Sequence, residues 1–184
     1  MENQYFEKEL GYIKNEEIRN ACMEVLKHVN EEFYKAPASS TGKYHPEYSL
    51  GEGGLYRHTC AAVRIAQCMR ENTVVQDFND DDFDYIIAAL ILHDSCKSGK
   101  NWDSKYTKHG HPLEAVQLVE EVLPDSYFCA KMAALISTHM GQWTTCKWDK
   151  TELPYPESPA QMFVHLCDYL ASRRFIEINF DKEV

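Results

Sequence analysis

The most informative stretch of the chain is Ile86-Ile87-Ala88-Ala89-Leu90-Ile91-Leu92-His93-Asp94-Ser95-Cys96-Lys97. Its long apolar run predicts a buried helix. The run ends abruptly in an imidazole and a carboxylate, and Lys97 follows one turn after His93. Burying His93 and Asp94 together without partners costs free energy, whereas a divalent cation offsets the desolvation of both. The stretch therefore predicts a metal site at the end of a core helix.

Other histidines and aspartates extend this pattern to five predicted helices, and four of the six residues interrupt apolar stripes where a core residue is expected. A lone histidine on an apolar face is more often a hydrogen-bonded core or helix-end residue than a ligand. The indication of a metal site therefore comes from the whole set and its order along the chain, which is His58, His93, Asp94, His111, His139 and Asp168.

This ordered series resembles the HD-domain superfamily of metal-dependent phosphohydrolases. The resemblance covers roughly residues 50 to 175, most of the chain. The motifs that carry it are Gly53-Gly54-Leu55-Tyr56-Arg57-His58-Thr59, Leu92-His93-Asp94-Ser95-Cys96-Lys97 and Asp168-Tyr169-Leu170-Ala171. The family more commonly has His-Asp-Ile-Gly-Lys here. This chain has Ser95-Cys96 in place of Ile-Gly.

The resemblance implies a ligand set for each of two divalent ions. One ion would be held by His58, His93, Asp94 and Asp168, which alone would suffice for a mononuclear enzyme. His111 and His139 match the places where two-metal members carry the ligands of a second ion, with Asp94 as the bridging carboxylate. His109 is an alternative to His111, which is favoured because Ala115 then takes the place of the family's small residue one turn later. Ligand chemistry leaves Mn, Fe, Co, Ni and Mg open.

Cations around this cluster suit a phosphorylated substrate. The resemblance implies that Lys97 stabilises charge on a phosphoryl oxygen, although a lysine at a helix end is also favoured by the helix dipole. We expect substrate contacts from Arg57, Lys100, Lys108 and His109, with Lys105 on the same basic rim; a solvated loop explains these lysines nearly as well.

His165 is expected behind Asp168 or at the surface, and His28 and His45 as ordinary surface or loop residues, although the loop of His45 could fold over the cleft. Aromatic residues that could stack on a base are Trp102, Trp143, Trp148, Tyr44 and Tyr48, for which loop packing is the alternative.

Composition limits the classes of function. The 184 residues are 44% apolar and 12% aromatic, as in a soluble globular domain, and no apolar run predicts a membrane span or a signal peptide, so we expect a cytoplasmic protein. The net charge of −10 argues against binding long nucleic acid, because phosphate backbones require clustered Lys and Arg. Seven cysteines without a Cys-x-x-Cys pair are interpreted as reduced thiols.

The fold is predicted to be all-α: a single HD-type helical bundle domain over residues 1–184, with long ordered loops and a metal-binding core at about 50–175. Asp80-Asp81-Asp82 supplies caps and dipole-matching charges for the helix that delivers His93. The loop from Pro37 to Gly53 is expected to be ordered against the body, and the tail from Phe175 to Val184 to be a short strand or extended. The other predicted helices run from about Asn15 to Tyr34, Gly54 to Asn72, Pro112 to Leu123, Asp125 or Ser126 to Gly141, and Ser158 to Arg174.

Together with these residues, the resemblance implies an enzyme that uses a dinuclear metal centre to hydrolyse a phosphomonoester or phosphodiester of a nucleotide, dinucleotide or short oligonucleotide. Two alternatives stay open. Some diiron members of the superfamily use the same six residues for oxygen chemistry, and a binding or regulatory module would hold a structural metal. The sequence determines neither the substrate, nor the native metal, nor the oligomeric state.

Overall fold

The computed structural model describes residues 5–70, 72 and 78–176, and every regular element in these ranges is helical. The all-α prediction is confirmed. The elements are α1 (Glu7–Leu10), α2 (Glu16–Leu26), α3 (Glu32–Lys35), the 3₁₀ turn η1 (Glu47–Ser49), α4 (Gly54–Met69), α5 (Asp80–Leu92), α6 (His111–Val122), α7 (Tyr127–Ile136) and α8 (Pro159–Ala171).

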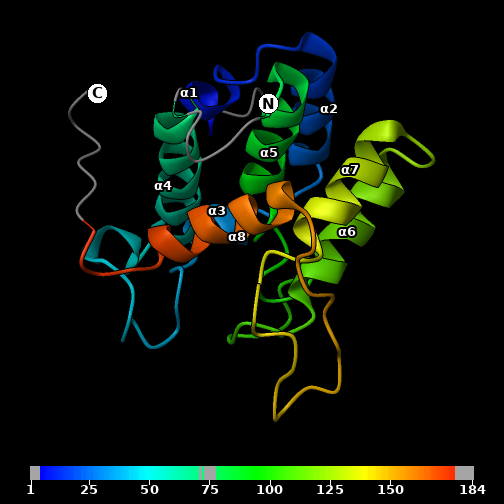
Figure 1. Ribbon diagram of the computed structural model, residues 1–184. Helices are drawn as coiled ribbons and strands as arrows, with labels where there is room; N and C mark the ends of the chain where they lie inside the picture. Colours follow the sequence, from blue (N-terminus) through cyan, green and yellow to red (C-terminus); the bar gives the residue numbers. More distant parts are fainter. Residues whose placement is uncertain (1–4, 71, 73–77, 177–184) are drawn as a thin grey trace.

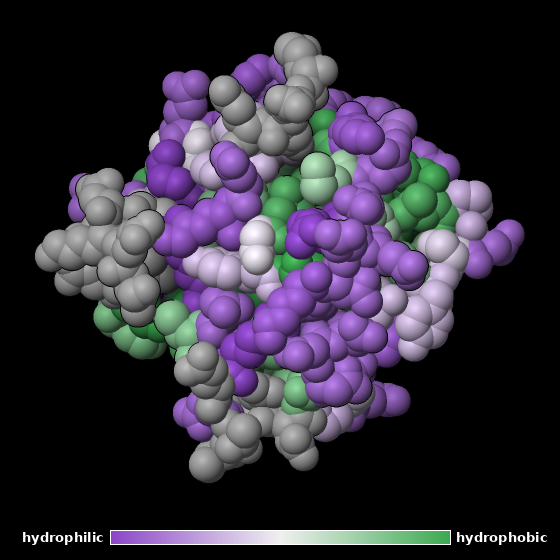
Figure 2. Space-filling view, turned by 90° about the horizontal axis from the view of Figure 1, so that it is seen from above, coloured by the Kyte–Doolittle hydropathy of each residue, from purple (hydrophilic) through white to green (hydrophobic). Residues whose placement is uncertain are grey.

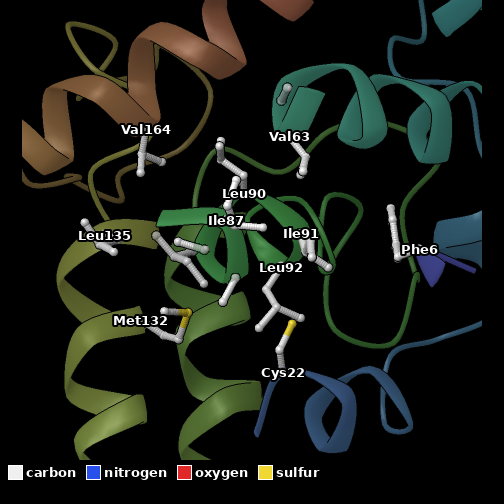
Figure 3. Close-up of a cluster of buried hydrophobic side chains, with 14 of the residues drawn as sticks. Phe6, Cys22, Val63, Ile87, Leu90, Ile91, Leu92, Met132, Leu135 and Val164 are labelled. Atoms are coloured by element: carbon white, nitrogen blue, oxygen red, sulfur yellow. The ribbon is translucent and has the colours of Figure 1, made fainter. Parts of the chain in front are cut away.

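Helix α5 is the centre of the fold. Figure 1 shows it between α4 and α7, with α8 crossing in front of the lower parts of α4 and α5. Every residue of α5 from Ile86 to Leu92 is fully buried, as expected for a helix that is apolar on all sides. Its side chains meet Val63 of α4, Met132 and Leu135 of α7 and Val164 of α8 (Figure 3). The surface is different: Figure 2 shows mostly hydrophilic side chains on the upper face, with separate apolar patches.

The start of α5 differs from the prediction. Asn79, not the aspartates, is the N-cap, and its side chain accepts a hydrogen bond from the Asp82 backbone N–H at 2.8 Å. Asp80, Asp81 and Asp82 form the first helical turn, where their charges match the helix dipole. The buried Asp84 carboxylate has its own partners, the Asn15 backbone N–H at 2.7 Å and the Arg70 guanidinium at 3.2 Å.

The first predicted helix, from Asn15 to Tyr34, is wrong as a continuous element. Asn15 is its N-cap as the start predicts, but α2 ends at Leu26 and α3 begins only at Glu32. The side chain of Asn30 accepts from the Glu32 backbone N–H at 3.0 Å and so starts the second segment. Val29 and Phe33 are both buried, so the apolar spacing continues through the break.

The remaining predicted helices lie where expected, with ends that differ by a few residues. Ser126 caps α7, and Ser158 caps α8 in a capping box with Gln161.

The loop from Pro37 to Gly53 packs on the body: the Tyr48 hydroxyl donates to the Ala171 carbonyl oxygen at 2.8 Å. Most of the tail predicted as strand or extended chain lies outside the described residues. Within the described ranges no helix is both long and apolar enough to cross a membrane.

Candidate metal centre

His93 and Asp94 lie directly after the central helix, at its buried end. His93 is the C-cap of α5, and its Nδ1–H donates to the Leu90 carbonyl oxygen at 2.7 Å. This hydrogen bond fixes the imidazole ring and turns Nε2 away from the helix. His93 is 0% exposed and Asp94 2%, so both polar groups stand in the core.

Two neighbouring helices bring His58 and Asp168 to the same point. His58 lies in the second turn of α4 and Asp168 near the end of α8. Nε2 of His58 lies 2.9 Å from Oδ1 of Asp168, and Nε2 of His93 lies 3.5 Å from the same oxygen. The packing of α4 and α8 against α5 thus gathers side chains that are more than a hundred residues apart in the sequence.

His111 and His139 complete the cluster from the other side. His111 is the first residue of α6, and its Nδ1–H donates to the Lys108 carbonyl oxygen at 2.6 Å. His139 lies in the turn after α7, where its Nδ1–H donates to the Ile136 carbonyl oxygen at 2.8 Å. The two Nε2 atoms face each other at 3.2 Å, and both side chains are 1% exposed.

Asp94 joins the two halves of the cluster, one oxygen to each. Its Oδ1 lies 3.0 Å from Nε2 of His111 and 3.8 Å from Nε2 of His139. Its Oδ2 lies 3.4 Å from Nε2 of His93 and 3.8 Å from Nε2 of His58. The four histidines therefore surround the Asp94 carboxylate, and Asp168 joins the cluster through His58 and His93.

The charges of the cluster are strongly coupled. Burial favours neutral His93, but the carboxylates of Asp94 and Asp168 outweigh it and raise the pKa of His93 to about 10. Burial also opposes ionisation of both carboxyls. Lys97, His93 and His111 nevertheless hold the pKa of Asp94 well below the usual range, and His58 and His93 do the same for Asp168. Burial and the neighbouring His93 and His111 lower the pKa of His139 to about 3, so its ring is neutral.

The donor set fits a divalent cation. Neutral His139 donates its Nδ1–H to a carbonyl oxygen, so its Nε2 carries a lone pair. This Nε2 atom lies 3.2 Å from Nε2 of His111. Nε2 of His93 is buried without a hydrogen-bond partner in the described part of the chain. An ion would bind the lone pair of His139 directly and that of His93 once it had displaced the proton on Nε2. Among the residues that the structure describes, three groups have ligand atoms all within 4.8 Å of one another: His58 with His93 and Asp94; His93 with His139 and Asp168; and Asp94 with His111 and His139.

Lys97 lies against the cluster. Its Nζ contacts Oδ2 of Asp94, the oxygen that faces His58 and His93, and its side chain is 14% exposed. Its backbone carbonyl accepts from the Lys108 N–H at 2.9 Å, which closes the loop that follows. Among the predicted cations in the described part of the chain, Lys97 is therefore the one whose charged group contacts a proposed ligand.

The other predicted substrate contacts lie outside the cluster, and Lys100, Lys108, His109 and Arg57 all have structural partners. Nζ of Lys108 lies 2.8 Å from the Asp103 carboxylate, and the Lys100 ammonium pairs with Glu121. Nε2 of His109 lies 3.1 Å from the Thr144 carbonyl oxygen, away from the six residues. Lys105 lies on the exposed loop, with its ammonium 5.4 Å from the centre of the Tyr106 ring.

Arg57 holds a loop in place. Its guanidinium donates to the carbonyl oxygens of Tyr48, of Leu50 at 3.0 Å and of Glu52 at 2.9 Å. These hydrogen bonds fasten the segment before α4 to the helix that carries His58. A role for Arg57 in substrate binding stays a prediction.

His45 and His165 lie closer to the centre than their sequence neighbourhood indicates. The ring centre of His45 is 6.0 Å from that of His58, and its buried Nδ1 has no partner among the residues described here. Burial and the neighbouring His58 lower the pKa of His45 to about 4. His165 donates from Nδ1 to the His139 carbonyl oxygen at 2.7 Å. The only sequence signal for these positions was the presence of His45 in a long aromatic loop and of His165 one turn before Asp168.

The helical body and its buried cluster of four histidines and two aspartates define an all-α protein with a candidate metal centre. The family model of the HD domain matches residues 55–173, and the chain belongs to this family. The matched span includes all six cluster residues and Lys97, and the HD domain indicates the superfamily of metal-dependent phosphohydrolases. No curated protein and no solved structure matches the chain.

Proposed function

We propose that the protein is a phosphohydrolase with a dinuclear metal centre, acting on a phosphomonoester or phosphodiester of a nucleotide, dinucleotide or short oligonucleotide. The observation that carries this proposal is the placement of Asp94. Its Oδ2 faces His58 and His93, while its Oδ1 faces His111 and His139. A carboxylate with a separate imidazole pair at each oxygen is suited to bridging two cations.

The proposed ligands divide into two sets. His58, His93, Asp94 and Asp168 would hold one ion, and Asp94, His111 and His139 the other. The backbone hydrogen bonds at Nδ1 of His93, His111 and His139 set the tautomer that leaves Nε2 for a cation. Mn, Fe, Co, Ni and Mg all suit oxygen or imidazole donors, so the donor set does not select among them.

Two bound ions would polarise the phosphoryl oxygens, provide a hydroxide near neutral pH and neutralise the leaving oxygen. Lys97 adds a fixed positive charge on the Oδ2 side of Asp94 that can stabilise charge developing on a phosphoryl oxygen. Water supplies both the oxygen that becomes bonded to phosphorus and the proton that the alcohol product takes as the P–O bond breaks. The chain therefore needs no separate nucleophilic side chain.

Local charge agrees with a small substrate. The whole chain carries −10, yet Lys97, Lys100, Lys105 and Lys108 lie in one segment beside the cluster. Lys100 and Lys108 are each about one-third exposed and retain acidic partners, so contacts to a phosphate would compete with Glu121 and Asp103. In the proposal, Lys97 is accordingly the principal cation and the other residues are secondary contacts.

The decisive experiment combines metal analysis of the freshly purified protein with a phosphate-release assay in Mn²⁺, Fe²⁺, Co²⁺, Ni²⁺ and Mg²⁺. Two ions per chain and phosphate release from nucleotides would support the proposal. Oxygen consumption with bound iron and no phosphate release would favour the diiron alternative. Bound metal without either activity would favour a regulatory module.

The bridging role of Asp94 is tested by Asp94→Asn, for which we expect the loss of both ions and of activity, because each set of ligands loses a charged oxygen. Asp80→Asn is the matched control, since Asp80 is 69% exposed and lies at the opposite end of α5. Two-metal occupancy in Asp94→Asn would contradict the bridging role.

A further inference from the structure

A cavity of about 510 Å³ opens directly beside Lys97. One wall comes from α3 and the segment after it, including Lys35, Pro37 and Ser40, and the other from the loop after Lys97, including Trp102. Lys97 both lines this cavity and contacts the metal cluster, because its ammonium touches Asp94. A molecule with a phosphoryl group at the cluster would therefore extend past Lys97 into this cavity.

Both walls are fixed to the elements that carry the candidate ligands. The carbonyl oxygens of Lys35 and Ala36 each accept a backbone N–H at 2.8 Å, from Gly53 and Leu55 at the start of α4. On the other side, the Trp102 N–H donates to the Gly99 carbonyl oxygen at 2.9 Å. The same loop is closed by the Lys108 hydrogen bond to the Lys97 carbonyl oxygen. The cavity is thus held in place without a ligand, as binding pockets usually are.

The lining combines a flat aromatic wall with hydroxyl groups. Trp102 has φ of 51°, a left-handed conformation that is rare for a bulky side chain and is often found at functional sites. Its buried Nε1–H has no partner within the described chain. Ser40 and Thr107 contribute hydroxyls, whereas Lys35 is paired with Glu31 at 3.3 Å and with Glu32 at 3.8 Å. Lys105 and Asp103 line the cavity with opposite charges, so it offers stacking and hydrogen bonds more than a second net charge.

We infer that this cavity binds the nucleoside part of a nucleoside monophosphate, with its base against Trp102 and its ribose hydroxyls among the serine and threonine side chains. A base has a flat π-face and acceptor atoms, and a ribose has hydroxyls, which are the features that the lining complements. The inference rests on the proposed function, since it assumes that the phosphoryl group lies at the cluster. It narrows the substrate class from nucleotides and oligonucleotides to mononucleotides.

The test compares two probes that share a phosphoryl mimic. One is methylphosphonate, and the other is a set of nucleoside 5′-methylenephosphonates of adenosine, guanosine, cytidine and uridine, in which carbon replaces the ester oxygen. Binding of each to the Mn²⁺-loaded full chain is measured by calorimetry, so no turnover is required. The variants are Ser40→Trp, which fills the cavity from an exposed loop position, and Trp102→Leu, with Trp148→Leu as the matched control because Trp148 is 85% exposed.

We expect at least one nucleoside phosphonate to bind the wild-type protein about tenfold or more tightly than methylphosphonate. Ser40→Trp and Trp102→Leu should each remove most of this advantage while leaving methylphosphonate binding within about twofold, and Trp148→Leu should change neither. The inference is overturned if no nucleoside phosphonate binds better than methylphosphonate, or if the advantage survives in both variants. Absence of phosphate release from every ester would instead refute the proposed function, so the two failures are distinguishable.

Discussion

His165 donates a hydrogen bond from its Nδ1 to the carbonyl oxygen of His139, at 2.7 Å. The contact ties α8, which carries Asp168, to the turn that carries His139. Gly141 makes the approach possible: it has φ of +60°, and a Cβ added there would lie 2.3 Å from Cε1 of the His165 ring. One half of the candidate metal centre thus depends on a histidine outside the six ligands.

This relationship predicts that His165→Leu weakens metal binding at His111 and His139 without removing a ligand. Loss of such a supporting hydrogen bond typically costs about 10–100-fold in metal affinity. Titration of the metal-free protein with Co²⁺, followed by absorption, should show one ion bound nearly as in the wild type and the other more weakly. His28→Leu is the control, since His28 is half-exposed and pairs only with Glu24 on α2. Equal affinities in His165→Leu and the wild type would show that the hydrogen bond has no role in positioning His139.

A second prediction separates His111 from His109, which the sequence alone leaves as alternatives. His111→Ala should lower the metal content from two ions to one, because its Nε2 lies 3.0 Å from Asp94. His109→Ala should keep both ions, because its Nε2 faces the Thr144 carbonyl oxygen. Elemental analysis of the two variants is a matched pair, each serving as the control for the other. The reverse result would assign the ligand to His109.

The sequence predicted the core helix better than the element boundaries around it. The apolar run that ends at His93 and Asp94 predicted a buried helix with a polar end, and the structure has that arrangement. The break between α2 and α3 was not predictable from apolar spacing, because Val29 and Phe33 stay buried on both sides of the turn. Here the local hydrogen bond of Asn30 decides the backbone path.

The roles of cations were the hardest to predict. Arg57 was predicted as a substrate contact because it belongs to a basic rim around the cluster, and in the structure three loop carbonyl oxygens accept from its guanidinium. A sequence gives the charge of a side chain but not the position of backbone carbonyls from distant turns. His45 is the opposite case, since only the path of the long loop before α4 brings it next to His58.

A third prediction concerns pH. Without an ion, the carboxylates of Asp94 and Asp168 overcome burial and raise the pKa of His93 to about 10, so near pH 7 its Nε2 carries a proton. A metal must displace that proton, and the apparent affinity should rise by up to about tenfold per pH unit between pH 6 and 8. His139, with a pKa of about 3, should contribute no proton in this range. Calorimetric titration with Mn²⁺ in two buffers of different ionisation enthalpy counts the protons released. Affinity that is independent of pH, with no proton release, would contradict the assignment of His93.

The last prediction concerns Lys97, which touches Asp94 but is not a proposed ligand. Lys97→Ala should lower kcat by roughly ten- to a thousandfold, because it removes a charge that stabilises the transition state. Metal content should stay unchanged, and so should the loop after α5, because the Lys108 N–H bonds to the backbone of Lys97 and not to its side chain. Lys27→Ala is the matched control: Lys27 also pairs with an acid three residues earlier, Glu24, but on an exposed face of α2. Lys97 lies beyond the last turn of α5, which ends at Leu92, so the favourable interaction of a lysine with the helix dipole, about 0.3–1 kcal/mol in the last turn, is an upper limit for a purely structural role. Wild-type kcat in Lys97→Ala, measured together with bound metal and Tm, would therefore remove Lys97 from the catalytic residues.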